Sequence, residues 1–225
     1  MTEIIVLVLL CTLAVGIFSL VQKRQTRTGS KNGMLRAQDL GRKPKPAQRN
    51  STKADVQNLL VYLLRYAKKH PELRVVCPGR VEYAGRQCGA TMLLVGPFGV
   101  QSIRCFGFGG AVGPADSGSD WVQTMNGATK TIMNPVQANS EDNALLRQVL
   151  KANGYREVPV YSCGVFTQEA VQLNTSPASS LYTVSQFKAW LESDALAQRG
   201  TYTEAVQPIT DLLARLAGIG EKAAK

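Results

Sequence analysis

The chain has 225 residues, enough for one domain of about 150 to 170 residues with appendages, and its hydrophobic fraction of 44% suits a globular core. The formal net charge is +10, but residues 22–50 hold nine Lys/Arg and one acid, whereas residues 51–225 hold 17 Lys/Arg and 14 Asp/Glu, a net charge of +3. Because the excess charge lies mainly in one segment, its distribution argues against a folded nucleic-acid-binding domain.

An uncharged apolar run occupies residues 4–21, close to the N-terminus. As a helix these residues reach about 27 Å, nearly the thickness of a bilayer core. Basic residues follow the run and none precedes it, and no small-x-small cleavage site is present, which favours an anchor over a cleaved signal peptide. The sequence predicts a single transmembrane anchor over residues 1–22 in the cell membrane, with the N-terminus outside and the remaining chain cytoplasmic.

The next segment, residues 23–52, is polar, basic and interrupted by glycine and proline. Such a composition buries too little apolar surface to offset its chain entropy, so it predicts a disordered linker. Residues 23–49 are expected to bind anionic lipid, to which each nearby cation contributes about 1 kcal/mol. Nucleic-acid binding by this segment is possible but not favoured.

The pattern from residue 51 to 70 predicts an amphipathic helix that ends before Pro71. His70, the only histidine, lies at the end of this helix, where the helix dipole favours a positive charge. Since a Ser/His/Asp or Cys/His hydrolase needs a histidine beside its nucleophile, this placement argues against both.

Two short strands are predicted over residues 73–77 and 80–84, around a Pro-Gly turn. Apolar runs at 91–95 and 100–106, joined by four residues with proline and glycine, predict a hairpin. If Val95 faces Val100 in this hairpin, Thr91 lies opposite Arg104. Arg104 shares one face of its strand with Val100, Ser102 and Phe106, because strand side chains alternate.

The C-terminal half predicts alternating helices and strands. A helix is expected over 140–154, with Ser140 as its N-cap and Gly154 as its stop. It is followed by an interior strand at 158–167, an edge strand at 170–174 and helices at 183–193 and 203–225. Together with the hairpin, this order predicts a mixed α/β layered fold.

Two common ligand sites are excluded by spacing. The glycine cluster at 107–113 lacks the GxGxxG spacing and the following helix that a dinucleotide or P-loop site needs. The five cysteines include no CxxC pair, so a metal cluster is not expected. We expect free thiols in a reducing compartment instead.

Four stretches together resemble the nuclease-related domain (NERD) family of the PD-(D/E)XK nuclease-like superfamily. They are "LLVGPFGVQSIRCFGFGG" at 93–110, the isolated Trp121, "NPVQAN" at 134–139 and "VYSCGVFT" at 160–167. The resemblance implies a restriction-endonuclease-like mixed sheet flanked by helices over residues 53–194, followed by a C-terminal helical extension over 195–225. An anchor before such a domain is similar to the arrangement in some bacterial members.

Active members of that superfamily bind Mg²⁺ through an Asp and a Glu on the two hairpin strands, and a Lys two residues after the Glu assists the attacking water. Matched to this chain, the Asp position falls on Thr91, the Glu position on Arg104 and the Lys position on Phe106. The glutamate that opens the family pattern in the first helix is also missing. The resemblance therefore implies that the metal site is lost, since a permanently charged guanidinium repels Mg²⁺.

A sheltered Arg104 needs a partner, and Glu82 on the preceding strand is the expected one, with Asp116 and Asp120 as alternatives. The simpler interpretation is that Arg104 extends to solvent from an edge. Its charge also predicts an anion-binding pocket beside Gly107, Gly109 and Gly110, whose backbone N–H groups would face the ligand.

Three functions remain open. The first is a membrane-anchored, catalytically inactive module (a pseudoenzyme) that needs no cofactor and binds a protein or a polyanion. The second is a Mg²⁺-dependent nuclease acting on DNA through migrated carboxylates, for which Glu82, Asp116 and Asp120 are the candidates. The third is an unrelated anchored α/β domain. Two carboxylates converging near Thr91 and Arg104 would distinguish the nuclease from the others.

Overall fold

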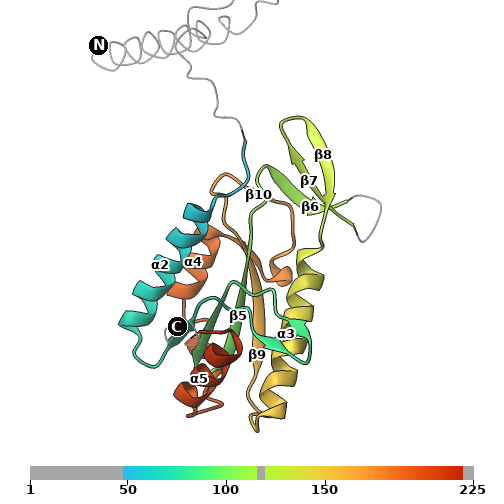
Figure 1. Cartoon of the computed structure of the whole chain (residues 1–225). Coiled ribbons are helices and arrows are strands. Elements are labelled where there is room, and N and C mark those ends of the chain that lie inside the picture. Colours follow the sequence, from blue (N-terminus) through green and yellow to red (C-terminus); the bar gives the residue numbers. More distant parts are fainter. Residues whose placement is uncertain (1–47, 116–119, 220–225) are drawn as a thin grey trace, which may run out of the picture. The chain divides into compact units, whose positions relative to one another are not determined.

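A mixed five-stranded sheet lies at the centre of the protein (Figure 1). The structure is a computed structural model that describes residues 48–115 and 120–219. The predicted anchor at 4–21 lies outside these residues, and within them no helix is long and apolar enough to cross a membrane. In sheet order, the central strands are β1 (Arg74–Val76), β4 (Met92–Gly96), β5 (Gly99–Phe106), β9 (Val160–Phe166) and β11 (Leu181–Thr183).

The predicted hairpin is confirmed as β4 and β5, which pair antiparallel with Val95 opposite Val100. Its loop is tighter than expected, because Gly96 already pairs with Gly99 and only two residues turn the chain. Gly99 has a φ of 110°, and a Cβ there would overlap the carbonyl of Pro159. A side chain at this position would therefore strain the turn and collide with the segment that leads into β9.

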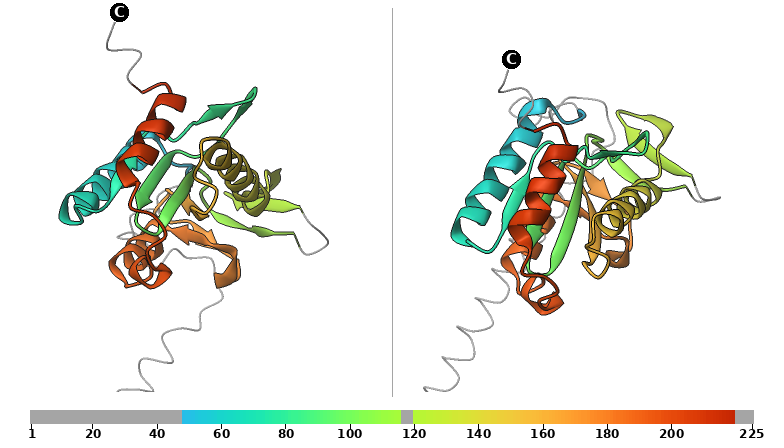
Figure 2. Two further views of the ribbon diagram at one scale, coloured as in Figure 1. Left: turned by 90° about the horizontal axis from the view of Figure 1, so that it is seen from below. Right: turned by 60° about the horizontal axis from the view of Figure 1, so that its bottom comes forward.

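The interior position of β9 is also confirmed, since β9 pairs in parallel with both β5 and β11. Helices cover both faces of the sheet, as Figure 2 shows from two directions. One face carries α2 (Lys53–Lys69) and α4 (Val184–Glu192), and the other carries α3 (Pro135–Ala152) and α5 (Val206–Leu216). The predicted class, a mixed α/β sheet flanked by helices, is thereby confirmed.

Alternation along the strands divides the core between the two helical layers. Leu94 and Ile103 pack with side chains of α2 and α4, whereas Leu93 and Val95 pack with side chains of α3 and α5. All four side chains are fully buried. The hairpin therefore contributes buried side chains to both halves of the core.

The predicted N-cap Ser140 is wrong, because α3 begins five residues earlier, at Pro135. Asn134 is the N-cap, and its side-chain oxygen accepts from the N–H groups of Val136 and Gln137 at 3.0 and 3.2 Å. Proline suits the first helical position because that N–H needs no partner within the helix. The C-terminal end agrees with the sequence, since Gly154, at a φ of 89°, follows the cap residue Asn153.

Helix α5 belongs to the central core. Ile209, Leu212 and Leu213 are buried in the same cluster as Leu145 and Val149 of α3. The described residues up to 219 belong to one compact unit, which therefore continues past residue 194, where the resemblance places the start of an extension.

A second, smaller sheet covers the end of β5, in the order β10-β6-β7-β8 (Figure 1). The predicted edge strand is found here as β10, which pairs in parallel with β6. The remaining pair, β2 and β3, forms a hairpin of its own, so β2 does not pair with β1. The bounds are β2 (Glu82–Tyr83), β3 (Arg86–Gln87), β6 (Ala111–Pro114), β7 (Trp121–Met125), β8 (Ala128–Ile132) and β10 (Gln172–Leu173), with short 3₁₀ turns at Pro177–Ser179 and Ala197–Arg199.

Candidate functional site

Arg104 is held in place by an ion pair with a helix on one side of the sheet. Its Nη1 donates to Asp142 Oδ2 at 3.2 Å and to the carbonyl of Ala138 at 3.3 Å, both on α3. The guanidinium also lies directly against Gly89, where an added Cβ would overlap it. With 19% of its side chain exposed, Arg104 is sheltered but reaches solvent on one side.

Asp142 joins three parts of the chain. Its side chain is 4% exposed, and while Oδ2 accepts from Arg104, Oδ1 accepts from the N–H of Gly89 at 2.7 Å. One carboxylate thus ties α3 to β5 and to the segment that precedes β4. A buried ion pair with a further hydrogen bond is costly to break, because removing one partner leaves the other charge uncompensated.

The prediction that Glu82 pairs with Arg104 is wrong. Glu82 is exposed on β2, which pairs with β3 and does not join the central sheet. Asp120 is exposed at the start of β7, and Asp116 lies outside the described residues. The sequence did contain a signal for the true partner, since Asp142 lies at helical spacing from the buried Ala138 and Leu146 on the core side of α3.

Thr91 lies beside Arg104, as the predicted register requires. It directly precedes β4, and two of its hydrogen bonds run to the residues on either side of Arg104. Its N–H donates to the Ile103 carbonyl at 2.9 Å, and its Oγ1 accepts from the Cys105 N–H at 3.0 Å. The same hydroxyl also hydrogen-bonds with the Cys105 side chain, so Thr91 fixes both the backbone and the thiol of its neighbour across the hairpin.

Phe106, two residues after Arg104, contributes a buried aromatic ring. It is 3% exposed, packs on Phe166 with 5.2 Å between ring centroids, and lies 5.8 Å from the guanidinium carbon of Arg104. The structure therefore brings Thr91, Arg104 and Phe106 together at the end of the hairpin.

A cavity of about 510 Å³ opens at this point, lined by all three of these residues. Arg80 and Arg104 supply two positive charges, and no acid is among the described lining residues. Burial raises the pKa of the lining Cys105 thiol to about 12 and also raises the pKa of Cys77, so both thiols are protonated at neutral pH. The lining side chains therefore include two cations, of which Arg104 is already paired with Asp142 behind it.

The glycines that the sequence assigns to this pocket separate. Gly107 lines the cavity, whereas Gly109 and Gly110 are not part of its described lining. The N–H of Gly109 donates to Asn50 Oδ1 at 3.1 Å, and an added Cβ at Gly109 would overlap the carbonyl of Arg49. The prediction that the Gly109 N–H faces a ligand is wrong, because a preceding part of the chain already occupies that donor.

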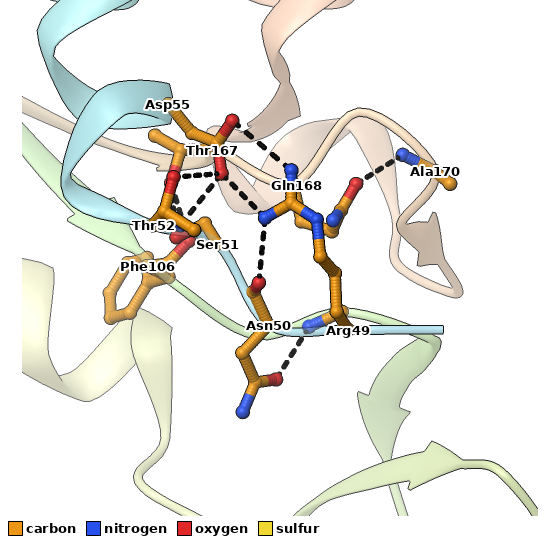
Figure 3. Close-up of polar contacts among 10 residues, drawn as sticks. Arg49, Asn50, Ser51, Thr52, Asp55, Phe106, Thr167, Gln168 and Ala170 are labelled. Atoms are coloured by element: carbon orange, nitrogen blue, oxygen red, sulfur yellow. Dashed lines mark hydrogen bonds and ion pairs between the residues drawn. The ribbon is translucent and has the colours of Figure 1, made fainter. Parts of the chain in front are cut away.

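Residues 48–52, assigned by sequence to a disordered linker, make specific contacts beside the cavity (Figure 3). The Ser51 N–H donates to the Gly107 carbonyl at 2.8 Å, and its Oγ accepts from Thr167 Oγ1 at 2.9 Å. Arg49 bonds to Asp55 at 2.9 Å. Hydrogen bonds from Arg49 and from the backbone of Thr52 lower the pKa of Asp55 to about 2, so this carboxylate is charged at neutral pH. The ordered domain thus begins before residue 53.

The arrangement suits an anion better than a cation. Arg80, Thr91 and Arg104 line the cavity, and Asp142 is the one described carboxylate that contacts Arg104. Within residues 48–115 and 120–219, no three His, Cys, Asp or Glu side chains are grouped closely enough to hold a metal ion. Guanidinium groups match the planar geometry of carboxylate and phosphate oxygens.

Comparison of the chain with models of known protein families, with curated protein sequences and with solved structures finds no match.

Proposed function

We propose that the chain is a membrane-anchored cytoplasmic protein whose NERD-like domain binds a ligand and does not cleave nucleic acid. The observation that carries this proposal is the ion pair between Arg104 and Asp142. In the family pattern, the position of Arg104 belongs to a carboxylate that holds Mg²⁺. Here that position carries a cation, and the nearby carboxylate is already engaged by the guanidinium and by the Gly89 N–H. A divalent metal needs oxygen ligands free of such competition.

Ligand binding at the cavity gives a role to its two arginines, which a metal-dependent nuclease site would not need. Arg80 is exposed and makes no ion pair with any described residue, although it lines the same cavity as Arg104. Together they favour an anionic ligand, either a small anion or an acidic part of a protein or polyanion. No cofactor is needed for this role. The basic segment at 23–49 supports a second contact, with anionic lipid.

The proposed lack of catalysis is tested with the purified protein and with single- and double-stranded DNA and RNA, in Mg²⁺ or Mn²⁺. We expect no cleavage above the level of a mock purification, because metal-assisted hydrolysis needs clustered carboxylates to hold the metal. Cleavage that persists through repurification and disappears in Glu82→Ala, Asp116→Ala or Asp120→Ala would replace this proposal with the migrated-site nuclease.

The proposed topology predicts the accessibility of the basic segment. A cysteine introduced as Ser30→Cys should resist an impermeant thiol reagent in intact cells and react after permeabilisation, because the basic flank stays on the cytoplasmic side. Ready labelling in intact cells would show that the orientation is reversed. Recovery of a shortened soluble form would show that the apolar run is cleaved.

A further inference from the structure

The cavity beside Arg104 is lined by both cationic and aromatic side chains, which can contact different parts of a ligand. We propose that it binds a phosphate group attached to a flat aromatic ring, the chemistry of a mononucleotide. This inference rests on the proposed ligand-binding function and adds the class of ligand.

The arginines that line the cavity have hydrogen-bond donors without a partner in the described part of the chain. Arg104 makes both of its hydrogen bonds through Nη1, and no acceptor among the described residues bonds to its Nη2 or Nε. Arg80 likewise has no ion-pair partner among those residues, although it lines the same cavity. These groups lie around one cavity whose described lining contains no acid. A phosphate, with several acceptor oxygens and a negative charge, matches this set better than a neutral ligand.

The cavity also has an apolar wall. Phe106 and Phe108 both line it, and their rings are nearly parallel, at an interplanar angle of 16° and a centroid distance of 6.5 Å. Phe108 is half-buried, and Met133, which also lines the cavity, is 49% exposed. A bare phosphate would leave this apolar wall in water, whereas a stacked aromatic ring would cover it.

The size of the cavity agrees with a ligand of this kind. Pockets for small molecules usually enclose about 300–1,000 Å³, and this one encloses about 510 Å³. A mononucleotide can therefore place its phosphate at Arg80 and Arg104 while its base lies against Phe108.

The test is calorimetric titration of the full chain with adenosine 5′-monophosphate, adenosine and inorganic phosphate. We expect saturable binding of the monophosphate, with adenosine and phosphate each at least tenfold weaker. Arg80→Ala should weaken binding of both phosphate-bearing probes by about tenfold or more. Phe108→Ala should weaken the monophosphate by about tenfold and leave inorganic phosphate unchanged.

Arg86→Ala is the matched control, because Arg86 is an exposed arginine on β3 that does not line the cavity. It should bind all three probes as the unchanged protein does, and a thermal melt of each variant confirms folding. The inference is overturned if the folded protein shows no saturable binding of the monophosphate, or if Arg80→Ala binds it equally well. If either of these results is found and the protein does not cleave nucleic acid, only the mononucleotide inference fails, and the proposed binding function still holds. Cleavage of nucleic acid would overturn the proposed function itself.

Discussion

Asp142→Ala should lower the free energy of unfolding by about 3 kcal/mol or more. The substitution removes the partner of a sheltered guanidinium and the acceptor of the Gly89 N–H in one step. An unpaired charge away from water is more costly than the loss of one average hydrogen bond, which is about 1 kcal/mol. Urea unfolding followed by circular dichroism measures the difference.

Glu141→Ala is the control, because Glu141 is the exposed neighbour of Asp142 on the same helix and should change stability by about 0.5 kcal/mol or less. The paired change Arg104→Met with Asp142→Leu should cost less than the sum of the two single losses, since apolar side chains can replace a buried ion pair. A loss below about 1 kcal/mol in Asp142→Ala would mean that Arg104 turns to solvent. The ion pair would then not hold Arg104 in place, and it would no longer support the proposed loss of the metal site.

A protein that ends at Asp194 should fail to unfold cooperatively, because it lacks α5. Ile209, Leu212 and Leu213 are buried in the core cluster shared with α3. Each such side chain contributes about 1.5–3 kcal/mol on burial, so their joint loss is comparable to the whole stability of a typical domain, about 5–15 kcal/mol. The measurement compares urea titrations of residues 48–194 and 48–219.

Residues 48–219 serve as the reference because they keep every described element and lack only residues 1–47 and 220–225. Leu213→Ala provides a milder version within the complete chain and should cost about 2–5 kcal/mol. If residues 48–194 unfold with the same midpoint and steepness as the longer form, then α5 is the dispensable extension that the resemblance implies.

The local sequence pattern is sufficient to predict those elements that are determined by residues close to one another in the sequence. The hairpin of β4 and β5 follows from two apolar runs and a short turn, and α4 begins where Thr183 can cap it. The start of α3 was misplaced because Ser140 offers a plausible cap, while Asn134 followed by proline offers a better one. Rules of this kind predict that a helix exists more reliably than they predict where it begins.

The partner of Arg104 was not predictable in the same way. Asp142 lies 38 residues from Arg104 and 53 residues from Gly89, so the contact exists only once α3 has packed on the sheet. The role of Gly109 is similarly non-local, since it lets Arg49 and Asn50 pass at close range. The sequence alone predicts that the Gly109 N–H faces a ligand, whereas in the structure it donates to Asn50.

The attachment of residues 49–51 has a mechanical consequence. Ser51 bonds to Gly107, which lines the cavity, and Asn50 bonds to Gly109 two residues further on. A movement of residues 49–51 is therefore passed to Gly107 through Ser51 and to α2 through the bond between Arg49 and Asp55. Because Gly107 lines the cavity, a displacement of Ser51 that moves Gly107 also changes the shape that the cavity offers to a ligand.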